Sequence, residues 1–186
     1  DDGGNGNAMS SIPVSVVIVS RGRPKALLRC LTGVSQLYYP NFEVIVVADP
    51  PGMKAIQDSK WDPLVKQVEF DEANISIARN LGVAQSAGEV VAFIDDDAVP
   101  EPTWLTHLCS PFENDPEVAV TGGFVRGRNG ISFQWKAQTI DVSGESQVLV
   151  VDEVRTTVLQ PTNGRAIKTE GTNMAVRRDV LADMGG

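Results

Sequence analysis

The chain has 186 residues, which suffices for one α/β core and is short for two full domains. Its formal charge of −8 argues against nucleic acid as a partner, because binding to a phosphate backbone depends on clustered Lys and Arg. No segment approaches the roughly 20 consecutive apolar residues that a membrane-spanning helix needs. We therefore expect one domain without a transmembrane segment.

The first ten residues, DDGGNGNAMS, carry Gly, Asn and Asp without periodicity and lack the apolar core of a signal peptide. We expect a disordered or vector-derived tail over residues 1–10 and one domain over residues 11–186. The two cysteines, Cys30 and Cys109, lie in apolar helical patterns rather than at a metal-ligand spacing. This usage favours reduced thiols and a cytoplasmic protein, and peripheral association with the inner face of the membrane stays open.

Apolar runs alternate with helical patterns in the first part of the chain. Residues 14–19 form a continuous β-branched run, typical of a strand buried on both faces. Pro24 then stands where a first helical residue would, and apolar residues recur at helical spacing as far as Leu37. A second strand is expected over residues 44–48, and it ends at Pro50 and Pro51, which cannot donate to a ladder.

The alternation continues to the middle of the chain. A short strand is expected at residues 68–70, a helix at residues 75–87 that stops at Gly88, and an apolar strand at residues 90–94. Strands and helices at this spacing predict βαβ units with right-handed crossovers. The predicted fold class is α/β, with a Rossmann-like, mostly parallel sheet flanked by helices.

The later elements are less regular. Helical spacing follows Pro100, and residues 118–125 predict a strand interrupted by two glycines. One or two strands are expected within residues 147–159, and a short helix is expected over residues 178–184.

Three polar clusters follow predicted strands. Residues 20–23 come after the first strand, Asp49 after the second and residues 95–97 after the fourth. In an open α/β sheet ligands bind outside the carboxyl ends of the strands, so these clusters are expected to converge there.

The sharpest feature is the run of Asp95, Asp96 and Asp97 directly after a buried strand. Adjacent carboxylates repel one another unless water or a cation relieves them. Oxygen ligands favour a hard cation such as Mg²⁺ or Mn²⁺, which proteins commonly hold with one or two carboxylates plus substrate phosphates. The sequence therefore predicts a divalent metal site that binds a diphosphate, with a solvated acidic turn as the alternative.

Four stretches, in this order and spacing, carry a resemblance to a known family: VSVVIVSRGRP, EVIVVADP, ARNLGVAQSAGEVVAFIDDD and EGTNMAVRRDVLADMGG. They resemble the nucleotide-binding portion of the family 2 glycosyltransferases, which have the nucleotide-diphospho-sugar transferase (GT-A) fold. The likeness extends from Ile12 to the end of the chain. It implies a nucleotide-diphosphate sugar as donor, with a UDP-sugar favoured, and a glycan or lipid-linked acceptor, as in cell-wall or polysaccharide biosynthesis.

The resemblance also implies roles for individual residues. Ser20 and Arg23 match the turn that flanks the nucleotide, Asp49 matches the acid that recognises the base, and Arg79 matches a helix arginine that faces the nucleotide pocket. A further loop beside the donor sugar and the acceptor is matched by Gly171, Thr172 and Asn173.

The acidic run matches the DxD motif of the family. Asp95 is implied near the ribose and as a second metal ligand, and Asp97 is implied as the ligand of the metal on the diphosphate. Asp96, between them, is expected among the residues that bind the nucleotide sugar. The general base of the family lies beyond the position of Gly186, so no catalytic base is expected in this chain.

The implied reaction is metal-dependent hexosyl transfer with inversion at the anomeric carbon. Two alternatives stay open, a non-catalytic sugar-nucleotide-binding module and an aspartate-dependent phosphatase, since Asp95 and Asp97 also form an acid pair at a strand end. A dehydrogenase is disfavoured because SRGRP replaces the GxGxxG turn after the first strand.

Overall fold

The computed structural model describes residues 11–127, 129, 132–135, 138–141, 143, 146–148 and 165–185. The tail expected over residues 1–10, and most of the strand region expected over residues 147–159, lie outside the described residues. The helices are α1 (Pro24–Val34), α2 (Pro50–Gln57), α3 (Ile75–Ala84), α4 (Trp104–Asn114) and α5 (Arg178–Asp183), with a 3₁₀ turn at Asp62–Leu64. The strands are β1 (Val14–Ser20), β2 (Phe42–Ala48), β3 (Lys66–Glu69), β4 (Val90–Asp95), β5 (Val120–Gly122), β6 (Val125–Arg126), β7 (Phe133–Trp135), β8 (Gln138–Asp141), β9 (Ser146–Val148), β10 (Arg165–Lys168) and β11 (Asn173–Arg177).

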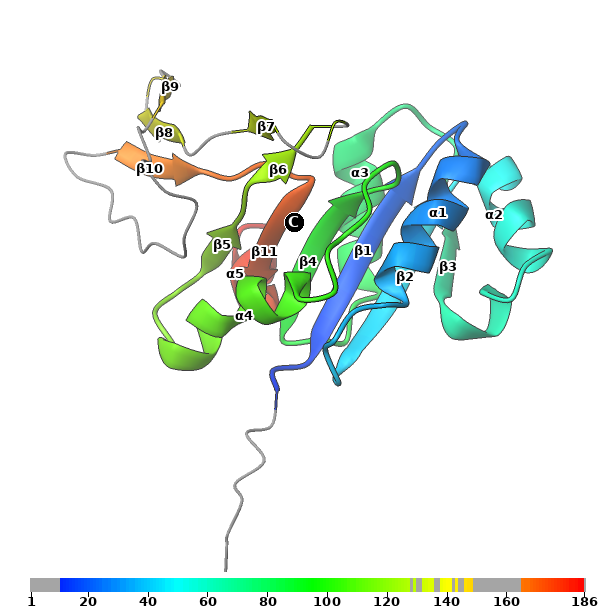
Figure 1. Cartoon of the computed structure of the whole chain (residues 1–186), viewed down its shortest axis with the longest axis horizontal. Coiled ribbons are helices and arrows are strands. Elements are labelled where there is room, and N and C mark those ends of the chain that lie inside the picture. Colours follow the sequence, from blue (N-terminus) through cyan, green and yellow to red (C-terminus); the bar gives the residue numbers. More distant parts are fainter. Residues whose placement is uncertain are drawn as a thin grey trace, which may run out of the picture.

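A six-stranded sheet in the order β3-β2-β1-β4-β11-β5 forms the centre of the fold (Figure 1). Strands β3, β2, β1 and β4 pair in parallel, as the βαβ pattern predicts. Strand β11 is antiparallel to both β4 and β5, so it alone runs against the other strands of this sheet. The prediction of a mostly parallel α/β sheet is confirmed.

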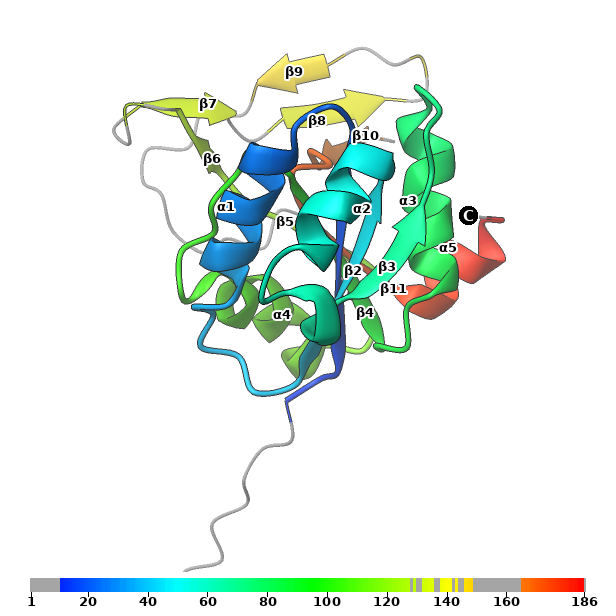
Figure 2. The ribbon, with the colours of Figure 1, turned by 90° about the vertical axis from the view of Figure 1, so that its right-hand side faces the viewer.

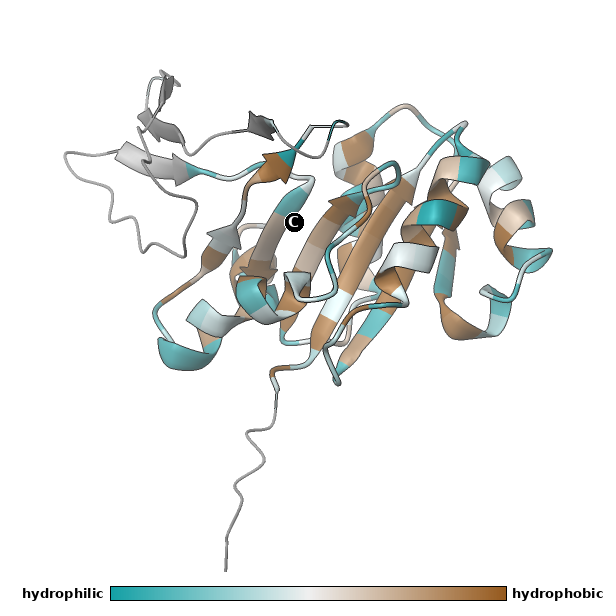
Figure 3. Ribbon diagram, viewed as in Figure 1, coloured by the Kyte–Doolittle hydropathy of each residue, from teal (hydrophilic) through white to brown (hydrophobic). Residues whose placement is uncertain are grey.

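Helices cover both faces of the sheet (Figure 2). Helices α1, α2 and α4 pack with Val16 and Ile18 of β1 in one apolar cluster, and α3 and α5 pack with Val17 in a second cluster on the opposite face. The central strands are mostly apolar, as Figure 3 shows, because side chains from both faces are buried. Two helical layers around the strands make the sheet a rigid platform for the loops at its carboxyl edge.

Helix α2 corrects the interpretation of the two prolines after β2. The prolines do end the strand, but they occupy the first turn of a helix, where a backbone N–H has no helical partner in any case. Asp49 is the N-cap of this helix and accepts a hydrogen bond from the backbone N–H of Gly52. The helix expected over residues 75–87 is shorter, ending at Ala84.

The strand expected over residues 118–125 is divided between two sheets, because β5 joins the central sheet and β6 pairs with β7. A third sheet has the order β10-β8-β9. Within the described part of the chain, no helix is both long and apolar enough to cross a bilayer. Both cysteines are free and buried, and burial raises the pKa of each thiol to about 12.

Candidate functional site

The carboxyl ends of β1 and β4 bring two of the predicted polar clusters together. The strands are parallel neighbours in register, with Val19 opposite Asp95. Ser20 therefore lies beside the start of the acidic run, and the serine and Asp96 are both buried.

Asp96 points into the protein rather than toward solvent. Its Oδ2 atom accepts a hydrogen bond of 2.7 Å from the Ser20 hydroxyl, and its side chain is 0% exposed. Its Oδ1 atom lies 2.7 Å from Nη2 of Arg23, an ion-pair contact without an aligned hydrogen bond. Burial raises the pKa of Asp96 above its ordinary value of 3.8, and the Ser20 hydrogen bond and the Arg23 charge oppose that rise. A nucleotide contact of Asp96 itself stays a prediction.

The flanking acids are open to solvent and each lies beside an arginine. The side chains of Asp95 and Asp97 are 42% and 43% exposed. Nη1 of Arg23 donates a hydrogen bond of 3.1 Å to Oδ2 of Asp97, and Nη2 of Arg79 lies 3.7 Å from Oδ1 of Asp95. The acidic run is therefore partly neutralised by two guanidinium groups.

Arg79 also joins the acidic run to the loop before β11. Its Nη2 atom donates a hydrogen bond of 3.2 Å to the carbonyl of Gly171, and its guanidinium lies 5.7 Å from the centre of the Phe93 ring. A Cβ atom at Gly171 would collide with that guanidinium. Gly171 is thus required for the close approach of Arg79.

The amide of Asn173 is held on both sides. Trp104 Nε1 donates a hydrogen bond of 2.9 Å to Asn173 Oδ1, and Asn173 Nδ2 donates one of 3.0 Å to the carbonyl of Phe124. These bonds fix the loop in which Thr172 is partly buried. Whether these residues contact a donor sugar or an acceptor stays a prediction.

Asp49 lies at the same edge of the sheet, but its carboxylate is engaged by backbone groups. Oδ2 accepts a hydrogen bond of 2.7 Å from the N–H of Gly22, and Oδ1 accepts one of 3.1 Å from the N–H of Gly52. Gly22 has a positive φ of 70°, a conformation that favours glycine, and Asp49 stabilises this turn. Asp49 thus fixes the loop that carries Arg23, and its contact with a base stays a prediction.

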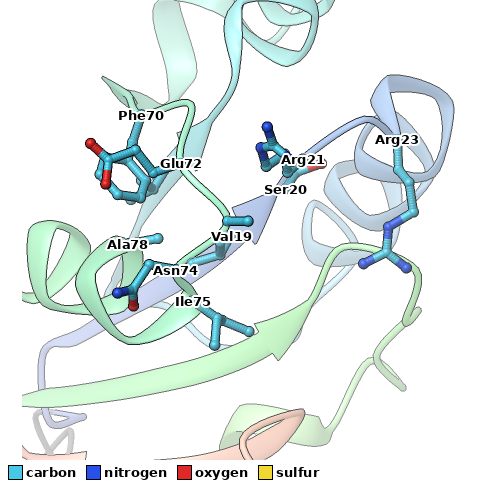
Figure 4. Close-up of a pocket in the computed structure, with 11 residues that line it drawn as sticks. Val19, Ser20, Arg21, Arg23, Phe70, Glu72, Asn74, Ile75 and Ala78 are labelled. Carbon is cyan, nitrogen blue, oxygen red and sulfur yellow. The ribbon is translucent and has the colours of Figure 1, made fainter.

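A pocket of about 250 Å³ opens beside this loop (Figure 4). Figure 4 shows Phe70, Glu72 and Asn74 on one side of it and Arg21 on the other, and Arg23 also lines it. Sequence reasoning missed Phe70, Glu72 and Asn74. The available signal was their position between β3 and α3, where Asn74 is the N-cap and accepts a hydrogen bond from the N–H of Ile77.

The exposed acids fit a divalent ion that takes its remaining ligands from elsewhere. Among the described residues, no three His, Cys, Asp or Glu side chains form a preassembled metal cluster. Mg²⁺ and Mn²⁺ need no such cluster, because one or two carboxylates, water and substrate phosphates can complete their coordination. Asp95 and Asp97 are the open carboxylates in the acidic run that can supply these contacts.

The model of the family described as "Glycosyl transferase family 2" matches residues 15–185 of the chain. The chain belongs to this family. Two relatives from Haloferax volcanii are a glucosyl-dolichyl phosphate glucuronosyltransferase, 28% identical, and glycosyltransferase AglE, 27% identical. The matches cover 93% and 95% of this chain, but 55% and 56% of the relatives. The chain thus spans about half the length of the curated relatives it matches.

Solved structures place this family 2 chain in the GT-A fold. The mannosyltransferase PcManGT of Pyrobaculum calidifontis, solved with GDP-Man and Mn²⁺, superposes with a TM-score of 0.65 at 18% identity. That match covers 96% of this chain and 48% of the other. GalNAc-T7, solved with UDP, GalNAc and Mn²⁺, superposes with a TM-score of 0.68 at 20% identity, covering 95% of this chain and 37% of the other. The GT-A prediction is confirmed.

Proposed function

We propose that this domain binds a nucleotide-diphosphate sugar through Mg²⁺ or Mn²⁺ and serves its transfer, with inversion, to an acceptor hydroxyl. The observation that carries the proposal is the pair of exposed carboxylates, Asp95 and Asp97, at the carboxyl edge of the sheet beside two arginines. Membership of family 2 supports glycosyl transfer as the reaction class. The solved GT-A structures with Mn²⁺ support a divalent ion.

In this proposal the donor occupies two neighbouring regions of the described residues. The pocket lined by Phe70, Glu72 and Asn74 has the apolar wall and polar rim that suit a nucleobase, for which the resemblance favours uracil. The diphosphate would then lie over the acidic run, where Arg23 and Arg79 present guanidinium groups that match phosphate oxygens.

The chemistry requires that charge on the departing diphosphate be neutralised. A bound divalent ion supplies Lewis-acid stabilisation of that charge. Asp95 and Asp97 would hold this ion. The positively charged guanidinium of Arg79, fixed by the Gly171 carbonyl, would lie beside it. We assign no general base to the described residues, and a glycan or lipid-linked acceptor is proposed from the resemblance.

Calorimetric titration of UDP and GDP sugars, with and without Mn²⁺, tests this function. We expect the intact domain to bind one donor class with an affinity that depends on the metal, because the diphosphate alone would meet the two exposed carboxylates of Asp95 and Asp97. Asp97→Ala should abolish the metal-dependent part of that affinity, because it removes the exposed carboxylate to which the resemblance assigns the metal on the diphosphate.

Asp58→Ala is the matched control, since Asp58 is an exposed acid that pairs with Lys54 at the end of α2. This variant carries the same change of charge and should bind the donor as the wild type does. Undiminished metal-dependent binding in Asp97→Ala would refute the proposed function.

A further inference from the structure

We infer that the Arg23 guanidinium occupies the proposed metal ligand Asp97 before metal binds, and that it leaves Asp97 for the diphosphate when metal and nucleotide bind together. The inference rests on the proposed function, since it concerns the same acidic run. It adds a thermodynamic property, namely that metal and nucleoside diphosphate each strengthen the binding of the other through this arginine.

The contacts of Arg23 differ from those of Arg79. Arg79 is held by a neutral carbonyl, that of Gly171, and lies near the face of the Phe93 ring, so its position does not depend on the acids alone. The contacts recorded for the Arg23 guanidinium are both with carboxylates, on Asp96 and Asp97. Its side chain is 54% exposed. Of the two arginines, Arg23 is the one whose charge can be redirected without breaking a packed contact.

Asp96 gives the guanidinium a fixed anchor. The Asp96 carboxylate is 0% exposed, is held by the Ser20 hydroxyl and lies 2.7 Å from Nη2 of Arg23. The contact of Nη1 with Asp97 is longer, 3.1 Å, and involves an acid that is 43% exposed. Nη2 can therefore stay on Asp96 while Nη1 turns from Asp97 to a phosphate oxygen. Asp96 becomes a positioning residue for Arg23 in this arrangement.

A coupling between the two ligands follows from this exchange. A metal ion that arrives alone at Asp97 must displace Nη1, which then has no new anion to bind. A metal ion that arrives with a diphosphate brings the replacement anion with it. The free energy lost at Asp97 is then recovered at the phosphate, and by linkage each ligand raises the affinity of the other by the same factor.

The test is a Mn²⁺ titration followed by electron paramagnetic resonance of the free ion, alone and with saturating UDP or GDP. The wild type should bind Mn²⁺ weakly alone and more tightly with the diphosphate, by a factor within the usual range of about 5 to 150. Arg23→Gln should bind Mn²⁺ alone several-fold more tightly than the wild type, because Asp97 is then free. The diphosphate should raise its Mn²⁺ affinity by a smaller factor than in the wild type.

Two further variants sharpen the result. Lys25→Gln removes one positive charge from an exposed position two residues further along the chain, in the first turn of α1, and it should leave the coupling factor as in the wild type. Arg23→Lys keeps the charge but lacks the planar fork that bridges two carboxylates, so its Mn²⁺ affinity without diphosphate should lie between those of Arg23→Gln and the wild type. If Arg23→Gln does not fold, Arg23→Lys provides the test, since its Mn²⁺ affinity without diphosphate should still exceed that of the wild type.

The outcomes separate this inference from the proposed function. If the wild type binds Mn²⁺ with a diphosphate but Arg23→Gln binds Mn²⁺ alone no more tightly, the inference is wrong and the proposed function stands. If the wild type binds no Mn²⁺ even with UDP or GDP, both are wrong. An equal gain in Lys25→Gln would show only a general charge effect, and it would also overturn the inference.

Discussion

Gly171 lets the Arg79 guanidinium approach the backbone because it has no side chain. The Arg79 guanidinium occupies the space that a Cβ atom at Gly171 would need, and it bonds to the Gly171 carbonyl. In Gly171→Ala the arginine must move, and its contact with Asp95 is altered. We expect about a tenfold loss of metal-dependent donor affinity, the equivalent of one charge-assisted hydrogen bond of roughly 1.5 kcal/mol, measured by calorimetry.

Gly88 provides the matched control for that substitution. A Cβ atom there would lie 2.6 Å from the backbone nitrogen of Ser15, which is held in the core of the sheet and cannot move aside. Gly88→Ala should therefore lower the free energy of unfolding, whereas Gly171→Ala should change it little, since a flexible side chain can yield. Equal loss of stability in both variants would contradict the assignment of Gly171 to the site.

The residues of the site were predictable to different extents. The convergence of Ser20, Arg23 and the acidic run follows from the rule that ligands bind at the carboxyl ends of parallel strands. The contacts among these side chains could not be predicted from that rule, because the sequence does not show that Asp96 turns inward to Ser20 and Arg23. The role of Asp49 as a cap was hidden for a similar reason, since its partner Gly22 is 27 residues away.

At the scale of elements, Glu43 links its own strand, β2, to β1, to β3 and to the segment before β4, at the edge of the sheet opposite the site. Its Oε1 atom accepts hydrogen bonds of 2.7 Å from the Ser15 hydroxyl on β1 and from the N–H of Ala87, just before β4. Its Oε2 atom lies 2.7 Å from Nζ of Lys66 on β3. Partial burial alone would raise the pKa of Glu43. These three contacts outweigh that effect, so the pKa lies below its ordinary value of 4.5.

This network predicts a specific dependence of stability on pH. A carboxyl group with a lowered pKa in the folded state stabilises the fold above its unfolded pKa, near 4.5, and this contribution is lost as the pH falls through the folded pKa. Glu43→Gln should lower the free energy of unfolding at neutral pH by roughly 1–2 kcal/mol. Urea unfolding at a series of pH values should show this difference shrinking below pH 4.5.

Glu69→Gln is the control for Glu43→Gln, because Glu69 is an exposed glutamate on the neighbouring strand β3. It should unfold with the wild-type free energy at each pH. A Glu43→Gln variant that keeps its full loss of stability in acid would show that packing, rather than charge, accounts for the effect.

Elements were predictable where local pattern and tertiary role agree. Strands β1, β2 and β4 are mostly apolar because both of their faces are buried, and the sequence shows this directly. Helix α2 was not predicted, because Pro50 and Pro51 indicate the end of a strand without showing that a helix begins there, although the first turn of a helix accepts prolines. The place of β11 between β4 and β5 was not predictable, since it depends on pairing with a strand about 80 residues earlier in the chain.

At the scale of the whole molecule, the proposed site exists only when the sheet is assembled. It combines residues from four places: Ser20 and Arg23 at the carboxyl end of β1, the acids at that of β4, Arg79 on α3 and Gly171 before β11. An unfolded chain keeps the acidic run, but the arginines no longer lie beside it and the pocket is absent. Metal and nucleotide together should therefore bind the native state far more tightly than the unfolded state, and the binding free energy should appear as global stability.

Thermal unfolding tests this linkage. Ligands present together at about 100 times their dissociation constant add roughly 2.7 kcal/mol, which for a domain of this size raises Tm by about 5–10 °C. Mn²⁺ alone at the same concentration should raise Tm by much less, because the acids are already paired with arginines in the native state. Asp97→Ala should lose the joint increase and Asp58→Ala should keep it. A full increase with Mn²⁺ alone would mean that the acids bind the ion without displacing a cation, and the exchange at Arg23 would then have no thermodynamic role.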